Sequence, residues 1–144
     1  MKHYTTRQNA IRELIRSNPI RTQRELVALL RERGFSCTQA TVSRDTAEMC
    51  LRKLSEGTYV LSEDMHLQHM LSEFVISVTA AGNLVVVRCH PGTASAVAFA
   101  VDEVKLNFCV GTIAGADTVF LAIDEPAHAQ QVCEVIEQLG SIDV

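Results

Sequence analysis

The stretch Thr38–Asp45 (TQATVSRD) constrains the fold of this chain more than any other segment. Thr38 predicts a helix N-terminus, because a threonine hydroxyl can accept a hydrogen bond from a free amide of the first turn. Val42, Thr46 and Met49 follow at helical spacing and form a narrow stripe that we expect to face inward. We therefore predict a short, two-sided helix that begins after Thr38.

The side chains on the outer face of this helix are of the types that contact nucleic acids. They are Gln39, Thr41, Ser43 and Arg44, next to the capping residue Thr38. Gln and Arg form paired hydrogen bonds to base edges, whereas Ser and Thr donate to bases or phosphates. An ordinary surface helix more often carries Glu and Lys at such positions. The pattern therefore favours a DNA-reading helix, with all five residues as candidate contacts.

Two further helices precede this one. Apolar residues at helical spacing predict a helix over residues 6–17, and Asn18-Pro19 ends it because proline disfavours helix in the residue before it. Thr22 and Glu25 form the pattern of a capping box at the start of a second helix, in which each satisfies a free amide of the other. Gly34 is placed to follow the last turn of that helix. The apolar residues of the second helix are Leu26, Val27, Leu29 and Leu30.

A hairpin is predicted after the three helices, from alternating segments over residues 51–54 and 58–61 around Gly57. Three helices and a hairpin are the plan of a winged helix-turn-helix domain, whose third helix enters the major groove while the wing touches the DNA backbone. The candidate phosphate contacts are Arg52 and Lys53 on the wing and Arg21 before the second helix.

Charge divides the chain into two parts. Residues 1–62 carry eleven Lys and Arg against six Asp and Glu, a balance of +5, whereas residues 63–144 carry two against eleven, a balance of −9. Together these give the net charge of −4. A basic part suits a polyanion and an acidic part suits a cation or a protein surface. We therefore expect two domains, at 1–62 and 74–144, with residues 63–73 as a polar linker in which a single helical turn is also compatible with the sequence.

The second domain alternates strands with helices. Strands are expected at about residues 74–78, 84–88, 107–114 and 118–123, and helices at about 93–104 (capped by Thr93) and 127–139. The residues expected to face inward on the last helix are Val132, Val135, Ile136 and Leu139. The order ββαββα predicts a small antiparallel α/β sandwich, so the fold class is α+β. Because such a small domain buries little core, burial between subunits would help to stabilise it.

Other sites are not favoured by the sequence. The five cysteines are scattered without a CxxC pair, so we expect them to be reduced and mostly buried. His66 and His69 have no third ligand nearby, and no metal site or cofactor is predicted. Cys89 and His90 cannot act together as nucleophile and base, because adjacent residues on a strand point to opposite faces. We therefore expect no enzyme. No apolar run reaches the length of a membrane span, so we expect a cytoplasmic protein.

The motifs TQATVSRD and GTIAGADT, with PGTASAVAFAVD before the latter, resemble those of the bacterial arginine repressors. The resemblance covers nearly the whole chain. It implies a hexamer of two trimers, held together by the second domains, with the winged-helix domains outside. It also implies binding to paired palindromic operators in double-stranded DNA, control of arginine synthesis or breakdown, and L-arginine as a corepressor bound between the trimers.

Residue by residue, the resemblance supports the DNA contacts and implies an effector site. Gln39, Ser43 and Arg44 match the family's reading helix. Asp102 and Asp117 match aspartates that contact the ligand, and Ser95 falls where some members have glutamine. The remaining effector-site positions are Thr112 and Ala114, on a strand that offers backbone groups, and Ala116.

Ala116 is the main departure from the family pattern, whose turn usually reads GTIAGDDT with two adjacent aspartates. The guanidinium and ammonium of arginine each need a carboxylate when they are desolvated. One missing carboxylate is therefore expected to weaken arginine binding about ten- to hundred-fold. We expect a weakened or altered arginine response. The open alternatives are a neutral change at Ala116 that a nearby acid compensates, a different effector, assembly without ligand or with a paralogue in mixed hexamers, and an accessory role in DNA architecture.

Overall fold

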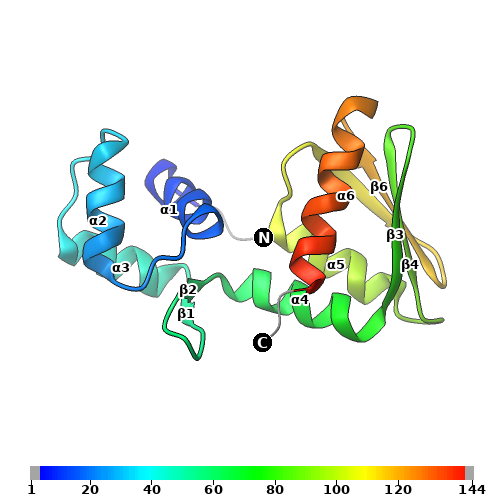
Figure 1. The fold of residues 1–144 in the computed structure, drawn as a ribbon, viewed down its shortest axis with the longest axis horizontal. Helices are drawn as coiled ribbons and strands as arrows, with labels where there is room; N and C mark the ends of the chain where they lie inside the picture. The colour runs from blue at the N-terminus through cyan, green and yellow to red at the C-terminus, as the bar shows by residue number, and fades with distance from the viewer. Residues whose placement is uncertain (1–3, 142–144) are drawn as a thin grey trace. The chain divides into compact units, whose positions relative to one another are not determined.

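The computed structural model describes residues 4–141, and its contacts divide the chain into two compact units with the boundary between residues 62 and 63. Each unit has its own buried core. Figure 1 shows three helices and a small hairpin in the first unit, and a sheet with helices in the second. This is the α+β class that the sequence predicts.

The N-terminal unit has three helices followed by a two-stranded antiparallel hairpin. The elements are α1 (Thr6–Ser17), α2 (Gln23–Glu32), α3 (Gln39–Glu48), β1 (Arg52–Lys53) and β2 (Tyr59–Val60). In the hairpin, Arg52 pairs with Val60 and Lys53 with Tyr59. The predicted winged helix-turn-helix arrangement is thus confirmed.

Threonine caps start all three helices of this unit. The hydroxyls of Thr5, Thr22 and Thr38 each accept a hydrogen bond from the amide three residues later. The predicted capping box at α2 is only half formed. The Glu25 carboxylate accepts from the hydroxyl of Thr22, at 3.3 Å, and not from its backbone amide. Gly34 follows α2 with a φ of +90°, which glycine adopts without strain. The helix starts therefore follow directly from the sequence.

The apolar stripes of the three helices meet in one core. Its buried side chains include Ile11, Leu14, Ile15, Leu26, Val27, Leu30, Val42 and Met49. Leu29, predicted to face inward, is only partly buried and packs at the edge of this core. Burying one such side chain contributes about 1.5–3 kcal/mol, so the stripes fix how the helices pack.

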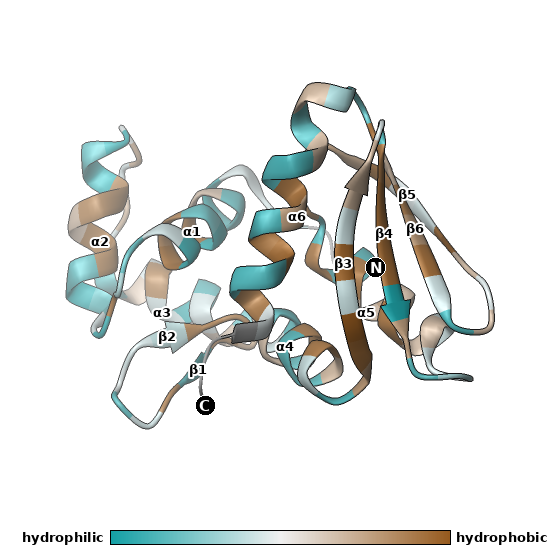
Figure 2. Ribbon diagram, turned by 45° about the vertical axis from the view of Figure 1, so that its right-hand side comes forward, coloured by the Kyte–Doolittle hydropathy of each residue, from teal (hydrophilic) through white to brown (hydrophobic). Residues whose placement is uncertain are grey.

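The C-terminal unit is a four-stranded antiparallel sheet with helices on one face (Figure 1). Its helices are α4 (Ser62–Phe74), α5 (Ala94–Val104) and α6 (Pro126–Ser141), and its strands are β3 (Val75–Ala81), β4 (Leu84–Cys89), β5 (Cys109–Ala114) and β6 (Thr118–Ile123). The strand order is β3-β4-β6-β5. Figure 2 shows that β4 is apolar along most of its length, and Val85 and Val87 are fully buried beneath the helices.

Residues 63–73, predicted to be a linker, form most of α4 instead. Leu67 and Leu71, one helical turn apart, are only 0% and 5% exposed and belong to the core of the C-terminal unit. Met70 and Phe74 pack against the same core, so the apolar face of α4 follows the helical spacing i, i+3, i+4, i+7, which the many polar residues of this segment obscured. The prediction of a linker was therefore wrong.

Two smaller predictions about the C-terminal helices also need correction. Val135 on α6 was expected to face inward, but its side chain is 38% exposed while its neighbour Ile136 is buried. Thr93 stands at the start of α5, but its hydroxyl donates to the carbonyl of His90 at 2.7 Å and caps no amide. Within residues 4–141, no helix has both the length and the apolar character needed to cross a membrane.

The sheet face opposite the helices carries apolar side chains at its centre. Val86, Phe120 and Ile113 form a row across three neighbouring strands. This row faces away from the core, because Val119 and Leu121 on either side of Phe120 are buried. Phe120 is 43% exposed and Ile113 is 70% exposed. Exposed apolar patches of this kind mark interaction surfaces.

Candidate nucleic-acid interface and effector site

Helix α3 exposes three of the four residues that the sequence places on its outer face, whereas Thr41 is half-buried. Its stripe of Val42, Thr46 and Met49 is buried, whereas Gln39, Ser43 and Arg44 are exposed. The side chains of Thr38 and Thr41 form hydrogen bonds within the first turn of the helix. The Thr38 hydroxyl accepts from the Thr41 amide at 3.2 Å and shares a 3.0 Å hydrogen bond with the Thr41 hydroxyl. Gln39, Ser43 and Arg44 therefore lie on the solvent-exposed face of α3, opposite the buried stripe.

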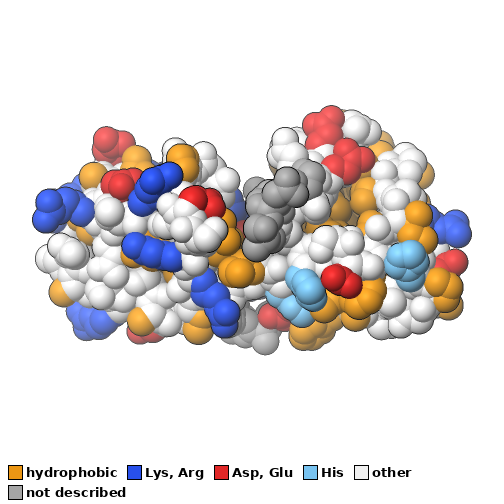
Figure 3. Space-filling view, turned by 60° about the horizontal axis from the view of Figure 1, so that its bottom comes forward, with side chains coloured by type: hydrophobic (Ala, Val, Ile, Leu, Met, Phe, Trp, Pro, Cys, Tyr) orange, Lys and Arg blue, Asp and Glu red, His pale blue; other side chains and the backbone are white. Residues whose placement is uncertain are grey.

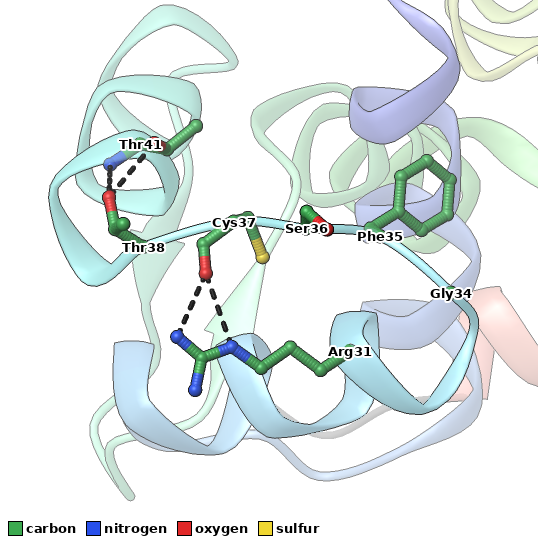
Figure 4. Close-up of a pocket in the computed structure, with 7 residues that line it drawn as sticks. All are labelled: Arg31, Gly34, Phe35, Ser36, Cys37, Thr38 and Thr41. Carbon is green, nitrogen blue, oxygen red and sulfur yellow. Dashed lines mark hydrogen bonds between the residues drawn. The ribbon is translucent and has the colours of Figure 1, made fainter.

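The turn between α2 and α3 is held by an arginine. Arg31 donates to the carbonyl of Cys37 through Nε at 3.2 Å and Nη2 at 3.0 Å. Figure 4 shows these bonds at the edge of a shallow hollow, where Arg31 reaches back from α2 to the connecting segment. The hollow is also lined by Phe35, Thr38 and Thr41. This brace sets where α3 begins.

The wing and the start of α2 carry the predicted phosphate-contacting cations. Arg21, Arg52 and Lys53 are all exposed. The Lys53 ammonium lies 5.0 Å from the centre of the Tyr59 ring on the paired strand, a cation–π contact that orients it. Most of the Lys and Arg side chains in view in Figure 3 lie on this unit. The unit therefore presents the positive surface that a polyanion requires.

Sequence reasoning missed a buried ionic cluster beneath α3. Asp45 is only 3% exposed, and Arg7 and Gln8 of α1 both donate to its carboxylate. The hydrogen bond from Arg7 to Asp45 raises the pKa of the Arg7 guanidinium. A signal was present, because Asp45 falls on the same stripe as Val42 and Met49, and a buried carboxylate needs a partner.

The effector-site prediction centres on the turn between β5 and β6. The Gly92 amide donates to the carbonyl of Ala116 at 2.8 Å, and the Cys89 amide donates to that of Asp117 at 2.7 Å. The turn is therefore fixed against the segment that leads into α5. Ser95 is exposed in the first turn of that helix, and Ala116 is also exposed.

The side chain of Asp117 already has two partners within the chain. The Thr118 hydroxyl donates to its Oδ1 at 2.8 Å, and Arg88 Nη2 lies 3.5 Å from its Oδ2. Both members of the ion pair are about half exposed, at 57% for Arg88 and 46% for Asp117. Arg88 was not singled out from the sequence, although it is the charged end of an apolar strand.

Asp102 and Thr112 form a second polar group of the predicted site. The Thr112 hydroxyl on β5 donates to Oδ1 of Asp102 on α5 at 2.9 Å, so the structure brings these two predicted residues together. Ala114, at the end of the same strand, packs against the core. The predicted residues thus fall into two groups, one around Asp102 and one around Asp117.

The burial of most of the cysteines agrees with the sequence prediction. All five cysteines are unpaired, and three of them are buried. Burial raises the pKa of the Cys89, Cys109 and Cys133 thiols, so these thiols stay neutral. His66 and His69 are exposed on α4, and among residues 4–141 no three His, Cys, Asp or Glu side chains gather in a way that could hold a metal ion.

Two protein-family models match this chain. The arginine repressor DNA-binding domain matches residues 3–67, and the arginine repressor C-terminal domain matches residues 71–138. An arginine repressor of Alkaliphilus oremlandii is 39% identical over 144 residues, which cover 93% of this chain and 97% of that protein. Those of Desulfitobacterium hafniense and Caldicellulosiruptor saccharolyticus are each 41% identical and cover 94% of this chain, with 97% and 95% of their own lengths covered. Because both units are matched in order and relatives agree over nearly the full length, the chain belongs to the arginine repressor family.

Proposed function

We propose that this chain is a transcriptional regulator of arginine metabolism, which reads operator DNA with α3 and responds to L-arginine through its C-terminal unit. The observation that carries the proposal is the face of α3, where Gln39, Ser43 and Arg44 are exposed opposite a buried stripe. An enzymatic function is set aside, because the family is one of repressors. A regulator must reach the chromosome, so we place it in the cytoplasm.

DNA recognition divides between two sets of side chains. Arg44 and Gln39 have the geometry for paired hydrogen bonds to guanine and adenine, respectively, in the major groove. Ser43, Thr41 and Thr38 can contact bases or phosphates. The wing residues Arg52 and Lys53, with Arg21, supply charge to the phosphate backbone, which raises affinity without specifying sequence.

The effector response rests on Asp117 and Asp102. An arginine ligand brings a guanidinium and an ammonium, and charge-assisted hydrogen bonds to carboxylates are the strongest contacts for both. Ala116 offers neither charge nor hydrogen bond at the position next to Asp117. Thr112 and Ala114 contribute backbone groups, and Ser95 a hydroxyl. We therefore expect arginine to bind, but less tightly than it would with a second aspartate in this turn.

Assembly is proposed to proceed through the C-terminal unit, to trimers and then to hexamers. The apolar row of Val86, Phe120 and Ile113 on the outer face of the sheet supports this, because a small domain gains stability by covering such a face. Mixed hexamers with a paralogue that carries the missing aspartate are a variant of the same scheme.

A second candidate function is favoured by the same alanine. If Ala116 abolishes the arginine response, the chain would act as an architectural DNA-binding protein that needs no effector, or respond to a different effector. Its contacts to DNA would be unchanged. The two functions differ only in whether arginine alters assembly and DNA affinity.

The test is a calorimetric titration of L-arginine into the purified full chain, with citrulline and ornithine as controls, while light scattering follows the size of the assembly. Saturable binding of arginine that converts smaller assemblies into hexamers is the expected result. Binding absent at millimolar arginine would remove arginine as the effector. A DNA duplex selected by the protein from a random pool then shows whether arginine changes its affinity.

A further inference from the structure

We infer that Arg7 is a positioning residue for DNA recognition: with Gln8, it grips the buried Asp45 and thereby fixes the rotation of α3 about its own axis. The inference rests on the proposed function of α3 as the reading helix. It assigns a role to α1 residues that are not themselves candidates for contact with DNA.

Arg7 forms a bidentate ion pair with Asp45, and the side-chain amide of Gln8 adds a further hydrogen bond. Arg7 Nε donates to Asp45 Oδ2 at 2.5 Å, and Arg7 Nη2 donates to Oδ1 at 3.1 Å. Gln8 Nε2 donates to the same Oδ1 at 3.2 Å and to Glu48 Oε2 at 2.8 Å. Paired guanidinium–carboxylate bonds are directional as well as strong, so they hold α3 in one orientation.

Because Asp45 is buried, its carboxylate requires the ion pair with Arg7. Its side chain is 4% exposed, and a buried carboxylate is costly unless it is paired and hydrogen-bonded. Any rotation of α3 that breaks the pair would leave this charge unsatisfied. Gln8 is itself held in place, because its side-chain oxygen accepts from the Thr5 amide at 3.1 Å in the capping box of α1.

The apolar contacts of α3 alone determine its rotation weakly. Its buried stripe consists of Val42 and Met49 with Thr46 between them. The Thr46 hydroxyl donates a hydrogen bond to the carbonyl of Ser43 in the same helix. Apolar contacts are not directional. Asp45 and Glu48, nearly one turn apart, are both tied to α1 and so fix the helix at two points.

The position of Asp45 determines the orientation of the DNA-reading residues through the helix backbone. Asp45 directly follows Arg44, so the angle at which Asp45 is held sets the direction from which Arg44 leaves the helix. A paired contact to a base edge tolerates little misalignment. Arg7 therefore acts on base discrimination through Asp45 and Arg44, and its charge is used within the protein rather than on a phosphate.

The experiment measures two quantities for each variant of the full chain: the ratio of affinities for a duplex selected by the wild type and a scrambled duplex, and the dependence of affinity on salt. Arg7→Lys keeps the charge but loses the paired geometry, so the affinity ratio should fall about ten-fold. Arg16→Lys, on the exposed last turn of α1, is the matched control and should leave the ratio unchanged.

A double variant guards against loss of folding. Arg7→Met with Asp45→Asn removes both charges and avoids a stranded carboxylate, so circular dichroism should show a folded protein. The affinity ratio should again fall about ten-fold, while the slope of log affinity against log salt stays at the wild-type value. A slope reduced by about one in this variant would show that Arg7 contacts a phosphate, and would overturn the inference.

Arg44→Ala separates this inference from the proposed function. If Arg44→Ala leaves the affinity ratio unchanged, α3 is not the reader and the proposed function itself fails. If Arg44→Ala lowers the ratio while Arg7→Lys and the double variant keep it, α3 reads DNA but Arg7 does not position it. A fall in all three variants, with Arg16→Lys unaffected, supports the positioning role.

Discussion

Arg88 on β4 places its guanidinium 3.5 Å from the carboxylate of Asp117, the residue expected to bind the guanidinium or ammonium of an arginine ligand. The chain therefore offers its own cation to this carboxylate. Both side chains are about half exposed, and exposed ion pairs of this kind contribute only about 0.2–1 kcal/mol. A ligand can displace Arg88 at small cost, but it must compete with it.

Arg88→Gln is expected to strengthen arginine binding by about two- to five-fold, because the competing cation is removed at the cost of a weak exposed pair. Isothermal titration calorimetry at low and moderate salt measures the change. A drop in affinity would instead mean that Arg88 helps to form the ligand site.

Asp117→Asn is expected to weaken arginine binding about ten- to hundred-fold, since a charged hydrogen-bond acceptor is lost. The measurement is the same titration, together with the size of the assembly by light scattering. Glu125→Gln, an exposed acid before α6, is the control for the loss of one negative charge. An arginine response that is intact in Asp117→Asn would show that the ligand binds elsewhere.

Ala116→Asp is expected to strengthen arginine binding by about ten- to hundred-fold, because it supplies a second carboxylate at an exposed position of the same turn. Ala116→Asn is the matched control, because asparagine has nearly the same size as aspartate but carries no charge. Equal affinities for the two variants would indicate that charge at this position does not matter to the ligand.

Arg44→Ala is expected to weaken binding to the selected duplex by about 1–3 kcal/mol and to relax the base preference at one position. Arg52→Ala on the wing should instead weaken binding to all duplexes alike and reduce the salt slope by about one. Repeating the selection from a random pool with each variant distinguishes the two effects. Identical selected sequences for Arg44→Ala and the wild type would remove Arg44 from the reading set.

Leu67→Ala is expected to destabilise the protein by about 2–5 kcal/mol, because it opens a cavity in the core of the C-terminal unit. His69→Ala, at an exposed position of the same helix, should change stability by no more than about 0.5 kcal/mol. Urea unfolding followed by circular dichroism measures both. A negligible effect of Leu67→Ala would restore the interpretation of residues 63–73 as a linker.

Local rules were enough to predict most of the elements of this chain. Threonine caps, the proline after Asn18 and the glycine turns act on neighbouring residues, so the helix starts and the hairpin agree with the sequence. Helix α4 was missed because polar residues outnumber the apolar ones at helical spacing, Leu67, Leu71 and Phe74 among them. What keeps that segment helical is the core beneath it.

The sequence by itself determined which residue types face outward on α3, because the spacing of Val42, Thr46 and Met49 leaves Gln39, Ser43 and Arg44 on the other side. Only the tertiary structure revealed the partners of Asp45 and Asp117. Asp45 contacts Arg7, which lies 38 residues earlier in the sequence. Asp117, in the turn before β6, contacts Arg88 on β4. Such ion pairs depend on how separate elements pack, and no local pattern encodes that packing.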